Sequence, residues 1–76
     1  MTEKTTMQAI ARMVPTGSRV LDLGCGDGAM LSYLQRERGC SGYGIEIDDA
    51  NVLACVQRGV DVIQLNLDEG DRKSVV

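Results

Sequence analysis

The sequence has no histidine and only three cysteines, which lie far apart along the chain. Zinc sites are usually built from clustered cysteine and histidine ligands, and a disulfide framework needs cysteines in pairs. The sequence therefore predicts no metal site and no disulfide framework. Unpaired thiols of this kind fit the reducing cytoplasm best.

Aromatic residues and long apolar runs are also scarce, with two tyrosines and no phenylalanine or tryptophan among 76 residues. The core must therefore be aliphatic, and no run approaches the ~18 apolar residues of a membrane span. Residues 1–7 are polar with mixed charge and lack the apolar run of a signal peptide. We expect one soluble domain, with a core that contributes only ~3–5 kcal/mol.

Positive charge is not concentrated anywhere in the chain. The eight Lys and Arg residues are scattered, and the formal net charge is −3. Proteins that bind nucleic acid usually present a basic patch to the phosphate backbone. Nucleic acid is therefore not an expected partner.

Glycine and proline separate three segments with helical spacing of apolar residues from three short apolar runs that are typical of buried strands. The order helix–strand, repeated three times, predicts an α/β fold with a parallel sheet and right-handed crossovers. The expected helices cover residues 4–13, 29–38 and 49–58, and the expected strands cover residues 19–23, 42–47 and 60–65.

The expected topology leaves one face of the sheet uncovered. With the strands in the spatial order 3-2-1, both right-handed crossovers step the same way, so both crossover helices pack on the same face. Parallel sheets are normally covered on both faces. We therefore expect either the N-terminal part of a larger Rossmann-like three-layer domain or self-association through the uncovered face.

The segment at residues 22–28 carries the chemistry. It lies where the first strand turns into a helix, which is where open α/β sheets bind ligands. Glycines allow the backbone to turn tightly there and to approach a ligand closely. Their spacing is ambiguous, because Gly24, Gly26 and Ala29 also satisfy the dinucleotide pattern G-x-G-x-x-G/A.

Charge separates the two cofactor classes. A dinucleotide would place a pyrophosphate at this helix N-terminus, but Asp22 and Asp27 flank the turn. A like-charge contact at about 4 Å costs about 4 kcal/mol at an effective dielectric of about 20. S-adenosylmethionine has no phosphate and carries an ammonium and a sulfonium. The acidic turn therefore favours this methyl donor over a nicotinamide or flavin cofactor.

A second acidic residue, Glu46, ends the second expected strand about 20 residues after the glycine turn, where a carboxylate often accepts hydrogen bonds from ribose hydroxyls. The alternative is a solvated charge cluster with Asp48 and Asp49 that precedes the next helix. Together with the glycine turn, the ribose role is favoured.

Residues 20–28 resemble the first motif of class I S-adenosylmethionine-dependent methyltransferases. Residues 14–22, 42–48 and 58–64 in addition resemble the methionine biosynthesis protein MetW family, and the resemblance covers about residues 10–70. Residues 71–76 do not fit the pattern. We therefore expect a chain that is truncated or altered in reading frame after Gly70.

The resemblance implies the class I methyltransferase fold, with S-adenosylmethionine or S-adenosylhomocysteine bound across the strand ends. The end of the first strand would contact the methionine part of the cofactor. The end of the second strand would contact the ribose and one face of the adenine, and the end of the third would contact the edge of the adenine. Asn66 replaces the aspartate more often found at its position and accepts through its side-chain oxygen. The implied residues are Asp22, Gly24, Cys25, Gly26 and Gly28 at the first end, Glu46 and Ile47 at the second, and Asn66 and Leu67 at the third, all within the cofactor-binding region 19–67.

The expected function is a MetW-type, S-adenosylmethionine-binding, methyltransferase-like domain linked to methionine biosynthesis. The resemblance also allows a non-catalytic accessory module for a homoserine O-acyltransferase, and an NAD-binding oxidoreductase fragment is a minor alternative. No catalytic residue can be named. Cys25 has no basic neighbour to activate it, so a passive role is expected. We expect no turnover from this chain alone.

Overall fold

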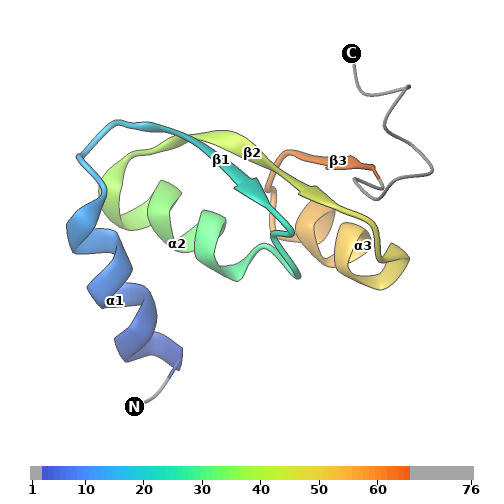
Figure 1. Ribbon diagram of the computed structural model, residues 1–76, viewed down its shortest axis with the longest axis horizontal. Helices are drawn as coiled ribbons and strands as arrows, with labels where there is room; N and C mark the ends of the chain where they lie inside the picture. The colour runs from blue at the N-terminus through green and yellow to red at the C-terminus, as the bar shows by residue number, and fades with distance from the viewer. Residues whose placement is uncertain (1–2, 66–76) are drawn as a thin grey trace.

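Three parallel strands form a sheet in the order β1-β2-β3, as the sequence predicts (Figure 1). The structure is a computed structural model and describes residues 3–65. The elements along the chain are α1 (Glu3–Met13), β1 (Arg19–Leu23), α2 (Ala29–Arg38), β2 (Ser41–Glu46), α3 (Asp49–Gln57) and β3 (Val62–Gln64). Predicted and observed boundaries agree to within one residue everywhere except at β3.

The third strand is shorter than the predicted range of residues 60–65. Val60 is buried and donates its N–H to the carbonyl of Cys55, so it belongs to the turn after α3 rather than to the sheet. Asp61 and Leu65 still bond to β2 at the two ends of β3. An apolar run alone does not distinguish a strand residue from a buried turn residue.

The helix ends follow the predicted capping chemistry. Gly39 ends α2 in the left-handed region, with φ 61°, and its N–H donates to the carbonyl of Leu34. Such a glycine is the usual helix stop. Asp48 caps the start of α3, where its carboxylate accepts from the N–H of Asn51 at 3.0 Å.

The core lies between the sheet and the helices: α2 and α3 cover one face, and α1 packs against α2 (Figure 1). The middle strand has glycine at helix-facing positions, and at Gly44 an added Cβ would collide with Cys25 and Leu31. These two side chains can therefore pack directly onto β2. The two buried clusters are Cys25, Leu31, Cys55 and Val60 under the carboxyl half of the sheet, and Ala11, Leu34 and Cys40 between α1 and α2.

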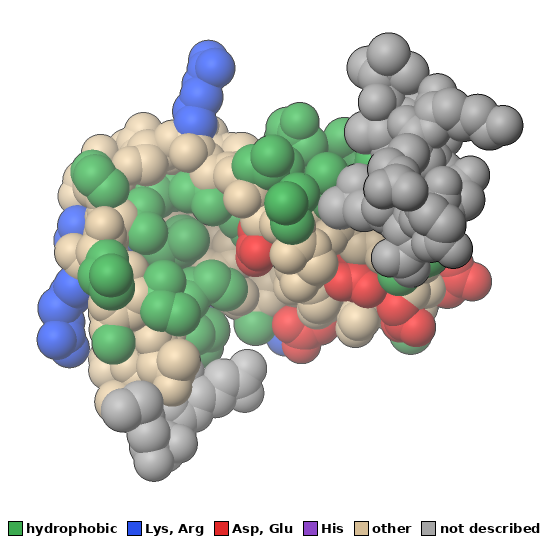
Figure 2. Space-filling model, in the orientation of Figure 1, with side chains coloured by type: hydrophobic (Ala, Val, Ile, Leu, Met, Phe, Trp, Pro, Cys, Tyr) green, Lys and Arg blue, Asp and Glu red, His purple; other side chains and the backbone are tan. Residues whose placement is uncertain are grey.

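Within residues 3–65 no helix covers the opposite face of the sheet, as the crossover handedness predicts. Side chains alternate along β1, so that Val20 and Asp22 are partly buried while Leu21 and Leu23 are 54% and 60% exposed. Tyr43 of β2 and Ile63 of β3 are also exposed. Figure 2 shows hydrophobic side chains gathered over the strands. None of the helices in residues 3–65 has the length and apolar character that a membrane crossing requires.

Candidate functional site

The glycine turn leaves β1 at the carboxyl edge of the sheet and leads into α2. Gly24 and Cys25 both donate their N–H groups to the carbonyl of Ile45, which holds the start of the turn on β2. Gly26 has φ 60°, and an added Cβ there would meet nothing within 4 Å. Its left-handed conformation therefore requires glycine, while the space beside it is open to a ligand.

Glu46 is tied to the turn by hydrogen bonds. Its Oε1 accepts from the N–H of Gly26 at 2.8 Å, and its Oε2 accepts from the N–H of Asp48 at 3.0 Å. These backbone donors stabilise the carboxylate and lower the pKa of Glu46 below its ordinary value, the Asp48 bond contributing most. Glu46 is therefore part of the turn, and the alternative of a merely solvated charge cluster does not describe it.

Asp22 has the opposite environment. It lies half-buried at the end of β1, and no residue within the described range 3–65 gives its carboxylate a hydrogen bond or an ion pair. Desolvation raises the pKa of Asp22 above its ordinary value. A partly desolvated carboxylate without a partner favours the approach of a cation.

Cys25 is buried in the glycine turn, and its sulfur lies 3.7 Å from the sulfur of Cys55. Desolvation, the hydrogen bond with Cys55 and the nearby negative charges of Asp22 and Glu46 raise the pKa of its thiol to about 12. The thiol stays protonated at neutral pH and is a poor nucleophile, in agreement with the passive role expected from the sequence.

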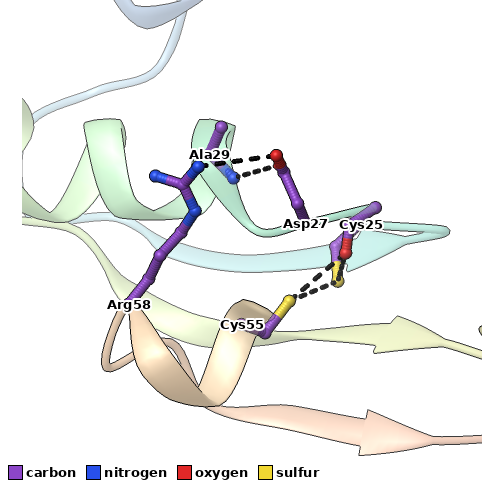
Figure 3. Close-up of polar contacts among 6 residues, drawn as sticks. Cys25, Asp27, Ala29, Cys55 and Arg58 are labelled. Atoms are coloured by element: carbon purple, nitrogen blue, oxygen red, sulfur yellow. Dashed lines mark hydrogen bonds and ion pairs between the residues drawn. The ribbon is translucent and has the colours of Figure 1, made fainter. Parts of the chain in front are cut away.

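Asp27 has a role that the sequence did not suggest. Its Oδ1 accepts from the N–H of Ala29 at 3.0 Å at the start of α2, and its Oδ2 lies 3.4 Å from Nη2 of Arg58 (Figure 3). The helix N-terminus, where a pyrophosphate would bind, already holds a carboxylate of this chain. No sequence pattern pairs Asp27 with Arg58, because the two meet only through the packing of α3 beside the turn.

The remaining predicted site residues are less defined. Ile47 is exposed, and its carbonyl accepts from the side-chain amide of Gln64 at 2.9 Å. Asn66 and Leu67 lie outside the described residues, so their expected contacts with adenine stay predictions.

A groove of about 420 Å³ lies between α1 and α2. None of its lining residues belongs to the glycine turn, and no sequence motif predicts the groove. Its lining residues are Met7, Gln8, Tyr33, Arg36 and Glu37.

Comparisons with known proteins show the family to which the chain belongs. The family described as "Methionine biosynthesis protein MetW" matches residues 4–74, which extends beyond the resemblance expected from the sequence at both ends. This chain belongs to the MetW family. It is 37% identical over 71 residues to the bifunctional methionine biosynthesis protein MetXA/MetW of Rhodopirellula baltica; the match covers 83% of this MetW-family chain and 11% of that relative.

Solved structures, among them an S-adenosylmethionine-dependent methyltransferase, share the fold of this MetW-family chain. The S-adenosylmethionine-dependent methyltransferase of Thiobacillus denitrificans, solved with S-adenosylhomocysteine, is 30% identical with a TM-score of 0.70. YjhP of E. coli is 28% identical with a TM-score of 0.75. Each match covers 86% of this chain but about 30% of the solved chain, 29% and 30% respectively. The Rossmann-like α/β fold class and the N-terminal position of the match are confirmed.

We predict that the two carboxyls of this MetW-family site titrate in opposite directions from their ordinary values. The bonds of Glu46 stabilise the folded chain above about pH 4.3, and this contribution is lost as the pH falls through its lowered pKa. For Asp22, burial favours the protonated carboxyl in the folded chain. This contribution to stability is fully present below about pH 3.9 and is lost as the pH rises through the raised pKa of Asp22. Carboxyl-carbon NMR titration measures both, with the urea-unfolded chain as reference. Shifts of both pKa values in the same direction would contradict this description.

Proposed function

We propose that this chain is an S-adenosylmethionine-binding, methyltransferase-like domain of the MetW type that acts in methionine biosynthesis and in the cytoplasm. The observation that carries the proposal is the hydrogen bond from the N–H of Gly26 to Oε1 of Glu46, which ties the carboxylate at the end of β2 to the glycine turn that follows Asp22. The three free cysteines fit a reducing compartment.

The charge distribution supports a cationic cofactor. In the view of Figure 2, acidic side chains gather in the half of the molecule that contains α3, whereas Lys and Arg side chains lie mainly in the other half. The carboxylate of Asp22 can attract the ammonium or sulfonium of the methyl donor. Each oxygen of Glu46 accepts one backbone bond and keeps lone pairs for the two ribose hydroxyls. Gly24, Gly26 and Gly28 would wrap the cofactor, with Ile47 against the adenine and Asn66 and Leu67 at its edge.

A dinucleotide fits this edge less well. Its pyrophosphate would need the N-terminus of α2, where Asp27 accepts from Ala29. The charge of Asp27 is only partly compensated, because its ion pair with Arg58 is half-exposed and such pairs contribute about 0–1 kcal/mol. Like-charge repulsion therefore opposes an NAD-type cofactor.

Calorimetric titration with S-adenosylmethionine, S-adenosylhomocysteine and NAD tests this assignment. We expect binding of the first two and none of NAD. Asp22→Asn and Glu46→Gln should each weaken binding about tenfold or more, because each removes a charged partner of the ligand. Asp61→Asn, an exposed carboxyl outside the turn, is the matched control and should bind as the wild type does.

Two results would overturn the assignment. Binding of NAD alone would remove the methyl donor as the cofactor. Unchanged affinity for S-adenosylmethionine in both turn variants would show that the cofactor binds elsewhere.

A second candidate function is an accessory module for a homoserine O-acyltransferase, the partner that the family resemblance implies. The R. baltica relative supports it, because its name joins a MetXA part and a MetW part in one bifunctional protein. A module of this kind needs the cofactor site but no acceptor site. The thiol of Cys25, whose pKa is about 12, stays protonated at neutral pH and does not serve as a catalytic base.

We predict that this chain alone transfers no methyl group, and that a full-length family member forms a complex with the acyltransferase. A radiolabelled methyl-transfer assay over a panel of small acceptors, together with co-sedimentation, measures both. Methylation by the full-length protein without its partner would favour the enzyme over the accessory module, and methylation by this chain would contradict the prediction.

We also propose that this chain self-associates through the bare face of its sheet, with a second copy as the occupant. The centre of the face is apolar and uncharged, with Leu21, Leu23, Tyr43 and Ile63 exposed. Two identical patches complement each other about a twofold axis without charge repulsion. Three short strands about 4.8 Å apart provide less than the ~800 Å² per partner of a standard interface, so the association should be weak.

Sedimentation velocity over a range of concentrations measures this association. We expect a concentration-dependent shift from monomer to dimer that Leu23→Lys suppresses, because a charge cannot be buried between the two faces. Leu53→Lys is the control, since Leu53 is equally exposed but lies on α3. A folded monomer at every concentration would contradict this interface.

A further inference from the structure

Gly26 is held on both sides. Its N–H donates to Oε1 of Glu46 at 2.8 Å, and its carbonyl oxygen accepts from Sγ of Cys55 at 3.3 Å. The two bonds fix the peptide groups before and after this residue. They therefore fix the left-handed conformation of Gly26, which no side-chain packing around it can do, because the space beside it is empty.

The bond from Cys55 comes from the interior. Cys55 is fully buried on α3, with 0% exposure, and its sulfur also lies against Gly28, where an added Cβ would come within 2.9 Å. Arg58, three residues later, reaches Asp27 on the far side of the turn. Figure 3 shows both side chains pointing from the end of α3 toward the turn.

The neighbouring thiol does not replace this contact. Cys25 Sγ lies 3.8 Å from the same carbonyl and 3.7 Å from the sulfur of Cys55. Its contact with Gly26 is a longer one between adjacent residues. Cys55 alone links the carbonyl of Gly26 to another element of the fold among the described residues.

We propose that Cys55 is a positioning residue of the cofactor site, acting through Gly26 on Glu46. The thiol holds the Gly26 carbonyl, the N–H of Gly26 then points at Oε1 of Glu46, and this bond orients the carboxylate for the ribose hydroxyls. A thiol is a weak donor, so the effect is modest but specific to a side chain with a hydrogen to donate. This inference rests on the proposed function for the ligand, whereas the link from Cys55 to Gly26 exists in the free protein.

The test compares Cys55→Ser, which keeps a donor, with Cys55→Ala, which removes it. Cys40→Ser and Cys40→Ala are the matched controls, because Cys40 is equally buried but packs against Ala11 and Leu34, away from the turn. Amide hydrogen exchange of Gly26 in the free protein is measured relative to amides within α2, so that a general loss of stability cancels. Affinity for S-adenosylmethionine is measured on the same four variants.

We expect Cys55→Ala to speed exchange at Gly26 and to weaken cofactor binding, each by about three- to tenfold, as for the loss of one weak hydrogen bond. Cys55→Ser should stay near the wild type in both, and the two Cys40 variants should not differ from each other. If Cys55→Ala does not fold, Cys55→Val fills the site without a donor and should show the same losses.

Equal behaviour of the serine and donor-free variants at Cys55 would overturn the inference and leave Cys55 as a packing residue. A wild-type chain that does not bind S-adenosylmethionine would instead overturn the proposed function. The exchange rates of Gly26 would still decide whether Cys55 positions the turn.

Discussion

The right-handed crossover between parallel strands is the constraint on which the rest of this structure depends. Because β1, β2 and β3 follow one another in one direction across the sheet, both crossover helices lie on the same face (Figure 1). The same connections bring the ends of β1 and β2 to one edge. Asp22 and Glu46, far apart in sequence, therefore lie at the same edge as the glycine turn, and among residues 3–65 no helix covers the opposite face.

The glycine turn depends on the left-handed conformation of one residue and on hydrogen bonds with residues far away in the sequence. Its conformation requires glycine at Gly26. Its two carboxylates differ in environment: Glu46 is stabilised by backbone donors, while Asp22 is partly desolvated and has no partner among residues 3–65. Such a pair of environments in one site is typical of functional positions. The turn is thus held to the rest of the protein through the bonds of Glu46, whereas the negative charge of Asp22 is left without a compensating positive charge in the described residues.

Most of the fold could be predicted from the sequence, because it depends on local signals. Helix stops such as Gly39, the cap at Asp48 and the alternation in β1 are each encoded within a few residues. The length of β3 could not be predicted, because the apolar side chain of Val60 packs in the core from the turn after α3 and does not belong to a strand. The contacts of Cys55 and Arg58 with the turn were also beyond prediction, because they depend on where α3 packs.

The glycine at position 44 in the middle strand links the sheet to the binding turn. It has no side chain on the helix-facing surface, and the side chains of Cys25 and Leu31 occupy that space. The turn therefore rests directly on the backbone of β2. The side chain of Cys25 fills the space that a Cβ at position 44 would need, so any residue larger than glycine at position 44 would displace Cys25. The identity of the residue between the motif glycines is thus coupled in size to a strand position that no cofactor motif includes.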